Sequence, residues 1–293
     1  MSDFSNSTIG VTGASGQLGR AVIAHLQRRG AQKIVAITRD PAKLADLHGV
    51  DARVGDFANP ASLDTAFRGV DRLLLISTDA VGIPGGRHPL HSAAIDAAER
   101  AGVKHVVYTS ITNPYPSQTA LVANDHFWTE RRLFDFKGDW TALRDNIYMD
   151  MLLHDAPRAL ASGQWFHAAG DGEKAFVTRD DVAATAAGVL LTLDGKSVVD
   201  VGGVPIAMTE VAAAFANAAG RPIQAVAISS EQAIAGMTGA GLPPNLAAAF
   251  AAFDSDTARG LFTVTSDAVA RFAGRQPTTV TEFLAKQQLT AAA

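Results

Sequence analysis

The stretch Thr12-Gly13-Ala14-Ser15-Gly16-Gln17-Leu18-Gly19 decides the fold of this chain. It follows an apolar run, Ser7–Thr12, that reads as a strand, and it opens a segment of helical length, Gly16–Gly30. In such a unit Gly13 permits the tight turn, Gly16 lets the backbone approach a pyrophosphate, and Gly19 lets the helix pack closely on the strand. The positive end of the helix then faces the phosphates. The stretch therefore predicts a dinucleotide site at the start of an α/β sheet.

Apolar runs and segments of helical length alternate through the first 110 residues. Continuous apolar strands separated by helices predict a parallel sheet covered on both faces, and right-handed crossovers make it doubly wound. Asp40-Pro41 is typical of a helix start, while Gly30, Gly69 and Gly102 stand where a helix end favours a left-handed residue. The later runs are Lys33–Thr38, Ala52–Asp56, Arg72–Ser77 and Lys104–Thr109, with a sixth strand expected at Trp140–Arg144.

The length of 293 residues allows one large domain or two modest ones. We expect a dinucleotide-binding domain over residues 1–150 and a smaller α/β region on the substrate side over 151–293. Parts of the second region, such as 180–203, are expected to return to the core. Beyond the sixth strand, helices are expected at Met149–Ser162, Asp180–Leu193, Thr209–Ala219, Ser230–Gly239 and Pro244–Phe253, and strands at Ser197–Val201 and Ile223–Ala227.

The composition excludes several classes of protein. Hydrophobic residues make up 47% and charged residues 18%, as in a chain with a packed core. A formal net charge of −4 gives no electrostatic basis for binding nucleic acid or an anionic membrane. The chain has no cysteine, which excludes disulfides and thiolate ligands, and we predict no metal site. The N-terminus lacks the apolar segment of a signal peptide, and no apolar run approaches the roughly 18 residues of a membrane span. We therefore expect a cytoplasmic protein.

The end of the second strand distinguishes the two nicotinamide cofactors. An acidic residue there binds the ribose 2′-hydroxyl, whereas an arginine accommodates a 2′-phosphate. Arg39 stands at the tip of this strand, Lys43 follows one helical turn later, and Asp40 is explained as the helix cap. We therefore expect NADPH as the cofactor, with NADH as the alternative.

Small polar residues follow most of the predicted strands. The carboxyl ends of parallel strands line the crevice in which such sheets bind ligands, although helix or turn capping explains any single one of these residues. Their shared placement favours the site. The residues expected at the cofactor are Thr12, Gly13, Ser15, Gly16, Gln17, Leu18 and Gly19 in the glycine-rich stretch, and Asp56, Phe57, Ser77, Thr78, Thr109 and Ser110 at later strand ends.

Eight stretches along the chain share their pattern with one known family: TGASGQLG (12–19), VAITRDPAK (35–43), GDF (55–57), GVDRLLLIS (69–77), AGVKHVVYTS (101–110), LRDNIY (143–148), VTRDD (177–181) and GAGLP (239–243). On these residues the chain resembles the NmrA-like group of atypical short-chain dehydrogenases. Within that group it is most similar to the type 2 NAD(P)H:quinone oxidoreductases, with triphenylmethane reductases as near relatives. The resemblance implies a Rossmann domain, a small C-terminal domain closing over the nicotinamide, and NADPH-dependent reduction of quinones. The superfamily also suggests a homodimer.

The sixth strand departs from the family pattern. The family usually reads Leu-Arg-Asn where this chain has Leu143-Arg144-Asp145. The resemblance places Arg144 and Asp145 at the cofactor, beside the expected nicotinamide region. Because a carboxylate replaces an amide there, we expect a change in substrate preference or in pH dependence, with Asn146 as a partial substitute.

The Tyr-x-x-x-Lys pair of most short-chain dehydrogenases is absent, because none of Tyr108, Tyr115 and Tyr148 is followed four residues later by lysine. This counts against an ordinary ketoreductase, in which the tyrosine donates a proton. It fits reduction of a quinone, whose stabilised aryloxide product can take its proton from water. A reductase of another conjugated acceptor, such as a dye, an enone or a ketone, is one alternative. A non-catalytic redox sensor of the NmrA type is another.

Two residues are candidates for acid–base chemistry. His126 and Glu130 stand four residues apart on one predicted helix face. We expect His126 to donate a proton or to bind the cofactor, with Glu130 orienting it; a surface pair is the alternative. Tyr148, just past the sixth strand, is expected to line the nicotinamide pocket, unless it is only a core aromatic.

The small aromatic or quinone substrate is expected beside the loop that follows the fifth strand. Phe127 is a candidate wall for an aromatic acceptor, although aromatic residues on helices are more often core. Arg87 and His91 resemble family positions near the cofactor, with a capping role as the alternative. The residues expected at the substrate are Asn113, Tyr115, Phe127 and Tyr148.

Overall fold

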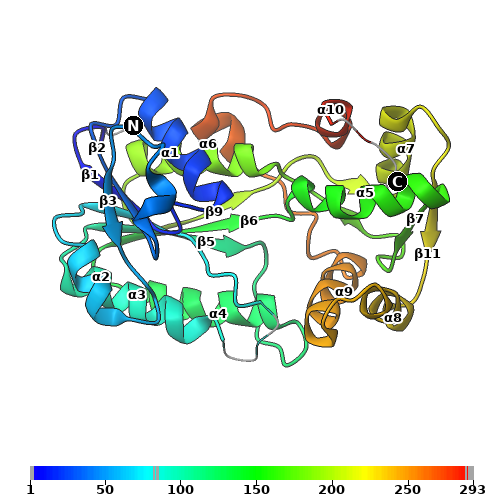
Figure 1. Cartoon of the computed structure of the whole chain (residues 1–293), viewed down its shortest axis with the longest axis horizontal. Coiled ribbons are helices and arrows are strands. Elements are labelled where there is room, and N and C mark those ends of the chain that lie inside the picture. The colour runs from blue at the N-terminus through cyan, green and yellow to red at the C-terminus, as the bar shows by residue number, and fades with distance from the viewer. Residues whose placement is uncertain (1–2, 82, 84–85, 288, 290–293) are drawn as a thin grey trace.

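A seven-stranded parallel sheet forms the centre of the computed structural model, which describes residues 3–81, 83, 86–287 and 289 (Figure 1). Its strand order is β3-β2-β1-β4-β5-β6-β9, and every neighbouring pair runs parallel. The predicted doubly wound sheet is therefore confirmed, and its order reverses between β1 and β4. The strands are β1 (Thr8–Val11), β2 (Lys33–Thr38), β3 (Asp51–Val54), β4 (Arg72–Leu75), β5 (His105–Ile111), β6 (Asp139–Asp145) and β9 (Ser197–Val201).

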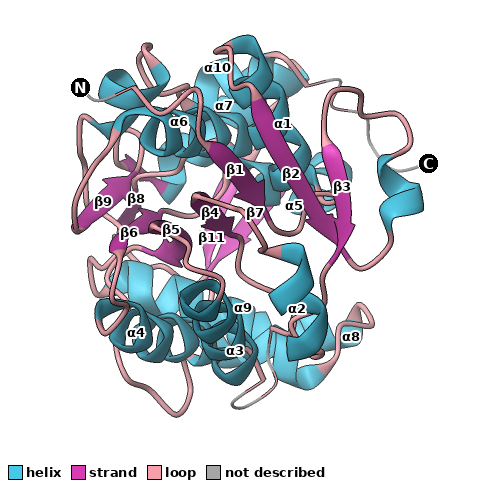
Figure 2. Cartoon of the chain, turned by 90° about the vertical axis from the view of Figure 1, so that its left-hand side faces the viewer, coloured by secondary structure: helices cyan, strands magenta, loops and turns pink. Residues whose placement is uncertain are grey.

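Helices cover both faces of the sheet, as Figure 2 shows. One face carries α1 (Gln17–Arg28) and α6 (Arg179–Thr192), and the other carries α2 (Pro60–Ala66), α3 (His88–Arg100) and α4 (Leu121–Phe134). Helix α6 is buried on nearly all sides, because its run from Asp181 to Leu191 packs between the sheet, α1 and the turn at Val269–Ala273. A helix that is apolar all round belongs in the interior.

The C-terminal region has a core of its own beyond the carboxyl ends of β5 and β6 (Figure 1). The rings of Trp165 and Phe215 stack there with 4.7 Å between centroids. Two small sheets accompany this core, β8 with β10 and β7 with β11. The elements are η2 (Met149–Met151), α5 (Leu152–Ser162), β7 (Gln164–His167), β8 (Glu173–Lys174), β10 (Ile206–Ala207), α7 (Met208–Ala219), β11 (Gln224–Ala227), α8 (Ser230–Gly239), α9 (Pro244–Ala258), η3 (Val269–Ala273) and α10 (Val280–Ala285).

The chain passes back and forth between the two regions. Residues 179–201 return from the C-terminal region to supply α6 and the edge strand β9, which pairs with β6. Residues 269–273 return again and pack on α6. A division at residue 150 stays a prediction.

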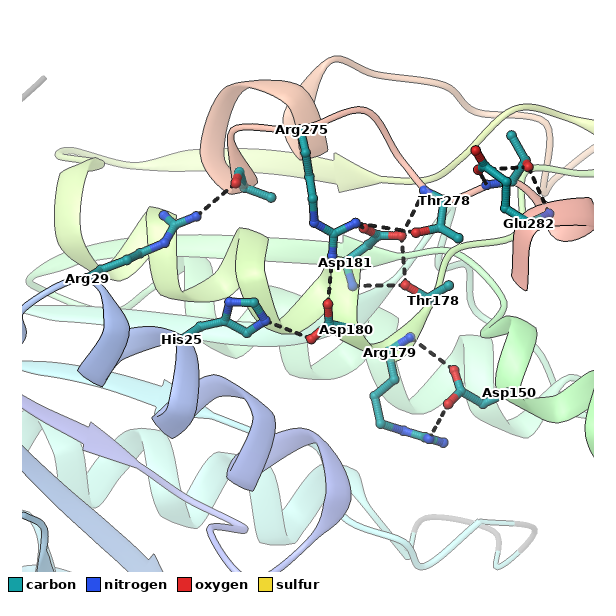
Figure 3. Close-up of polar contacts among 12 residues, drawn as sticks. His25, Arg29, Asp150, Thr178, Arg179, Asp180, Asp181, Arg275, Thr278 and Glu282 are labelled. Atoms are coloured by element: carbon teal, nitrogen blue, oxygen red, sulfur yellow. Dashed lines mark hydrogen bonds and ion pairs between the residues drawn. The ribbon is translucent and has the colours of Figure 1, made fainter. Parts of the chain in front are cut away.

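A group of ion pairs fastens the second return (Figure 3). Arg275 pairs with both Asp180 and Asp181 at the start of α6. Asp180 also lies 2.7 Å from Nε2 of His25 on α1. The backbone N–H of Thr278 donates to Oδ2 of Asp181 at 3.0 Å. We call Arg275, Asp180, Asp181, Thr178 and Thr278 the latch.

Several local expectations are confirmed and some elements were not predicted. Asp40 caps the turn at Pro41–Leu44, which is a 3-10 helix (η1) rather than an α-helix. Gly30, Gly69 and Gly102 have the positive φ expected at helix ends. The short strands β7, β8 and β10 and the helices η3 and α10 carry too few residues for a periodic signal. Over the described ranges, no helix is both long and apolar enough to cross a bilayer.

Candidate functional site

The glycine-rich turn between β1 and α1 has the shape that an anion requires. Gly13 has φ +59°, which favours glycine, and a Cβ on Gly19 would lie 2.4 Å from the Gly13 carbonyl oxygen. Among the described residues, no side chain caps α1 and no acid stands in its first turn. The amides of that turn and the positive end of the helix dipole are therefore available to a phosphate.

The residues predicted to hold the adenosine half lie around the ends of β2 and β3. Oγ of Ser15 lies 2.9 Å from Oγ1 of Thr38 at the end of β2. Arg39 is exposed at the adjoining strand tip, and Lys43 is exposed on η1. The carboxylate of Asp56 accepts the N–H of Ala58 and so closes the turn after β3. Within the predicted glycine-rich stretch, Gln17 is exposed, Leu18 is half-buried against the core, and Thr12 Oγ1 accepts the N–H of Ile76 and so joins β1 to β4.

A cavity of about 160 Å³ opens at the carboxyl ends of β5 and β6 and beside the segment that follows β4. Six residues predicted for the site line it, which brings together side chains up to 71 positions apart in sequence (Ser77 to Tyr148). Met151 of η2 and Phe253 of α9 close it from the C-terminal region. The predicted lining residues are Ser77, Thr109, Ser110, His126, Asp145 and Tyr148, and the others are Ile111, Asn146, Ile147, Met151 and Phe253.

Hydroxyl groups on β5 hold the floor of this cavity. The backbone N–H of Ser77 donates to Oγ1 of Thr109 at 2.9 Å, which fixes the segment after β4 against β5. Oγ of Ser110 donates to Glu130 at 2.7 Å. Phe57 lies just outside, half-buried, with its ring edge-on to that of His91 and 6.4 Å between centroids.

A buried chain of hydrogen bonds sets the proton position on His126. The backbone N–H of Thr78 donates to Nε2 of His91 at 2.9 Å, so the neutral His91 carries its proton on Nδ1. That nitrogen faces the hydroxyl groups of Tyr108 and Thr129, at 3.2 and 3.0 Å. The Tyr108 hydroxyl then donates to Nδ1 of His126 at 2.8 Å. His126 is left with its proton on Nε2.

Burial decides the protonation state of the three hydrogen-bonded side chains, His91, Tyr108 and His126. Desolvation lowers the pKa of both His91 and His126 well below the ordinary value, with Arg87 as the next cause. Desolvation also raises the pKa of the Tyr108 hydroxyl. All three groups are therefore neutral near pH 7, and His126 can offer an N–H but not a full imidazolium proton.

The predicted partner of His126 is wrong. In the described part of the chain, the Glu130 carboxylate bonds Ser110 and Arg144, and Tyr108 takes the orienting role instead. Arg144 and Glu130 form a two-bond ion pair at 2.9 and 2.7 Å. Arg144 and Asp145 are successive strand residues and point to opposite faces of the sheet. Asp145 lines the cavity, whereas the guanidinium of Arg144 is bonded to Glu130 on α4.

Asp145 and Tyr148 form a pair inside the cavity. The Tyr148 hydroxyl donates to Oδ2 of Asp145 at 2.8 Å. Desolvation raises the pKa of the Asp145 carboxyl well above its ordinary range, opposed by the Tyr148 hydrogen bond. Desolvation and the Asp145 charge both raise the pKa of the Tyr148 hydroxyl. The pair therefore favours the protonated form of both groups.

The predicted substrate loop contacts the C-terminal region. Nδ2 of Asn113 donates to the Leu261 carbonyl at 2.8 Å, and the Tyr115 hydroxyl donates to Asp256 at 2.6 Å. Asp256 lies on α9 and Leu261 follows this helix, so the loop contacts the C-terminal region at the end of α9. Phe127 is half-buried beside Trp128 and outside the cavity lining.

Three buried polar atoms at or beside the cavity have no hydrogen-bond partner among the described residues: Thr78 Oγ1, Arg87 Nη1 and Asp145 Oδ1. Unpaired buried polar groups cost about 1–3 kcal/mol each, so their presence here fits a polar ligand that would pair with them. Together with the glycine-rich turn, they fit a dinucleotide. Sequence reasoning missed Met151 and Phe253, which carry no polar signal; Phe253 also comes from an element far along the chain.

Comparison with known proteins points the same way. The model of the NAD(P)H-binding family matches residues 13–192. Quinone oxidoreductase 2 of Escherichia coli is 37% identical over 94% of this chain and 96% of its own length.

Solved structures share the fold. The NADPH complex of the E. coli NADPH-dependent quinone oxidoreductase has a TM-score of 0.88 at 36% identity, covering 94% of this chain and 98% of that one. The NADP(H) complex of Citrobacter triphenylmethane reductase has a TM-score of 0.87 at 33% identity, covering 96% and 100%. The resemblance inferred from the motifs is confirmed, and the chain belongs to the NAD(P)H-binding family.

Proposed function

We propose that this chain is an NADPH-dependent reductase that passes a hydride to a quinone. The observation that carries the proposal is the cavity at the ends of β5 and β6, which opens at the same edge of the sheet as the glycine-rich turn. Similarity to the E. coli quinone oxidoreductase supports the same reaction. The bound cofactor supplies the hydride, and the protein supplies its position and surroundings.

Different parts of the same sheet edge bind different parts of the cofactor. The first-turn amides of α1 and the Gly13–Gly19 turn hold the pyrophosphate. Arg39 and Lys43 lie where a 2′-phosphate requires cations. Because the strand order continues from β1 through β4 to β5 and β6, the nicotinamide half extends toward the cavity.

His126 acts as a hydrogen-bond donor to the acceptor oxygen. Its Nε2 proton is fixed by the Tyr108 hydrogen bond, and its low pKa keeps the ring neutral. A preoriented donor stabilises the negative charge that develops on that oxygen. Ile111, Ile147 and Phe253 add apolar walls suited to a flat ring. Most of the rate comes from holding the two reactants together.

The substrate assignment is tested with pure protein, NADPH and a benzoquinone. We expect loss of nicotinamide absorbance above the rate without enzyme. Reduction of a triphenylmethane dye but not of the quinone would reassign the acceptor. Tight cofactor binding without turnover of any acceptor would favour a sensor. Dimerisation stays a prediction that sedimentation would test.

Arg39→Ala tests the cofactor. We expect it to weaken NADPH at least about tenfold, the effect of losing one charge-assisted contact, and NADH by less than about twofold. Arg28→Ala removes an equally exposed cation at the far end of α1 and serves as the control. The measurement is the dissociation constant of each cofactor. Equal losses for NADPH and NADH would contradict the proposed 2′-phosphate contact.

A further inference from the structure

Asp145 is a buried carboxyl group with one oxygen free. It is 4% exposed, lines the cavity, and receives the Tyr148 hydroxyl on Oδ2. Its Oδ1 has no hydrogen-bond partner among the described residues. A side chain that lines the cavity therefore carries a buried carboxyl oxygen that has no partner within the described residues.

Within the described residues, the elements packed around Asp145 bring no cation to its carboxyl group. On α4, His126 is neutral, and Glu130 is occupied by Arg144, which points to the opposite face of the sheet. Met151 from η2 and Phe253 from α9 are apolar. Thr109 and Ser110 of β5 and Asn146 carry no charge.

The guanidinium of Arg179 lies beside Tyr148, the partner of Asp145. It lies 5.6 Å from the centroid of the Tyr148 ring and is ion-paired with Asp150. On β9, Asp200 is in register with Arg144, so its side chain lies on the face of the sheet opposite to Asp145. Asp145 therefore lacks the ion pair that would keep a buried carboxylate charged.

We propose that Asp145 is held as a neutral carboxylic acid and donates the proton that the reduced acceptor takes up. This inference rests on the proposed function. The quinone receives hydride, with its electron pair, from NADPH, which leaves one negative charge on a quinol oxygen. The O–H bond of Asp145 breaks, its proton forms a new O–H bond with that oxygen, and the carboxylate is reprotonated from water. The sum is quinone, NADPH and one proton giving hydroquinone and NADP⁺.

The positive charge that forms on the nicotinamide favours release of the Asp145 proton once the hydride has been transferred. The nicotinamide ring is neutral in NADPH and positive in NADP⁺, so the Asp145 carboxylate faces a cation only after hydride has left. Binding of NADP⁺ therefore releases a proton from Asp145, whereas binding of NADPH does not. By linkage, the ratio of the two affinities depends on pH.

The test compares both cofactors across the neutral pH range in the full-length protein. We expect NADP⁺ affinity to rise relative to NADPH affinity with increasing pH, by up to about tenfold per pH unit, the limit for one proton. Calorimetry in two buffers of different ionisation enthalpy counts the proton released. In Asp145→Asn, which keeps the shape and the Tyr148 bond, the ratio becomes independent of pH.

Asp256→Asn is the matched control. Asp256 is also 4% exposed, also accepts a tyrosine hydroxyl, and also has a pKa raised by desolvation. It differs in having an ion pair with Arg259 and in not lining the cavity. We expect its variant to retain the full pH dependence of the ratio. Loss of that dependence in Asp256→Asn, or its survival in Asp145→Asn, would overturn the assignment.

Turnover gives a second readout. We expect the loss of kcat in Asp145→Asn to grow with the basicity of the acceptor oxygen that Asp145 protonates. The loss should rise from about twofold for reactive benzoquinones toward about a hundredfold for acceptors with a more basic oxygen, as general acid catalysis requires. A uniform loss would instead mean a positioning role. If the wild type binds neither cofactor, the proposed function fails; if it binds and reduces quinones with a pH-independent ratio, only the role of Asp145 fails.

Discussion

Two buried aspartates in this molecule have opposite surroundings. Asp181, in the latch, is 0% exposed and receives the Thr178 hydroxyl at 2.7 Å, the Thr278 N–H at 3.0 Å and the Arg275 ion pair (Figure 3). The carboxyl group of Asp145, in the cavity, has only the Tyr148 hydroxyl as a partner in the part of the chain that the structure describes. The first has the partners that keep a buried charge stable, and the second does not. The difference separates a structural carboxylate from one that a ligand can use.

Local sequence explains why the latch is paired. Thr178 caps α6, its side chain accepts the N–H of Asp181, and two acids stand in the first helical turn. Acids there are stabilised by the helix dipole. Asp145 instead ends a strand, where the next residues face the apolar side chains of η2 and α9. At that end of the sheet Asp145 Oδ1 has no partner among the described residues, whereas Asp181 Oδ1 has the ion pair with Arg275.

Arg275→Ala gives the largest expected effect. It leaves Asp181 buried without its cation, so we expect a loss of about 3 kcal/mol in the free energy of unfolding, measured with urea. Arg271→Ala, on the same returning segment and packed on the Phe272 ring at 4.8 Å, is the control and costs less than about 1 kcal/mol. The pH dependence of the cofactor affinity ratio stays intact in both. Loss of that pH dependence in Arg275→Ala would mean that the latch affects the protonation of Asp145 in the cavity, which would contradict their separate roles.

Asp145→Asn has a smaller effect on stability, and its sign depends on pH. Because the carboxyl pKa is raised in the folded state, the folded protein holds a proton that the unfolded chain has released. The contribution of Asp145 to the free energy of unfolding is greatest below the ordinary carboxyl pKa. It is lost as the pH rises through the raised pKa, with a slope of at most about 1.4 kcal/mol per pH unit. The asparagine variant lacks this decline, so unfolding curves without cofactor should favour it increasingly at higher pH. Parallel curves for the two proteins would mean that Asp145 is charged in the folded state.

The sequence predicts the sheet well, and it predicts the strand-end residues that line the cavity better than the residues that close it. Thr109 and Asp145 lie near the carboxyl ends of β5 and β6, and the glycine-rich turn, Ser77 and Tyr148 come shortly after strands. Parallel strands bring these carboxyl ends together whatever the rest of the chain does. Phe253 reaches the cavity only through the packing of α9, which no periodic pattern encodes.

The fate of Glu130 shows the same limit. Spacing of four residues on a helix places it on the face of His126. Its carboxylate nevertheless bonds Ser110 of β5 and Arg144 of β6, because the sheet places a hydroxyl and a guanidinium each 2.7 Å from its oxygens. Tertiary contacts of this kind decide which of two neighbours orients the histidine.

Tyr148→Phe should give the smallest effect and the finest test of the comparison. The variant keeps the ring and removes the one hydrogen bond that Asp145 receives, and that bond lowers the pKa of the carboxyl. The pH at which NADP⁺ begins to gain over NADPH should therefore move upward, while the slope of the ratio stays the same. The measurement is the same pair of dissociation constants across pH. A shift to lower pH would mean that the Tyr148 hydroxyl does not stabilise the Asp145 carboxylate. Other partners would then have to stabilise that charge, as they do at Asp181.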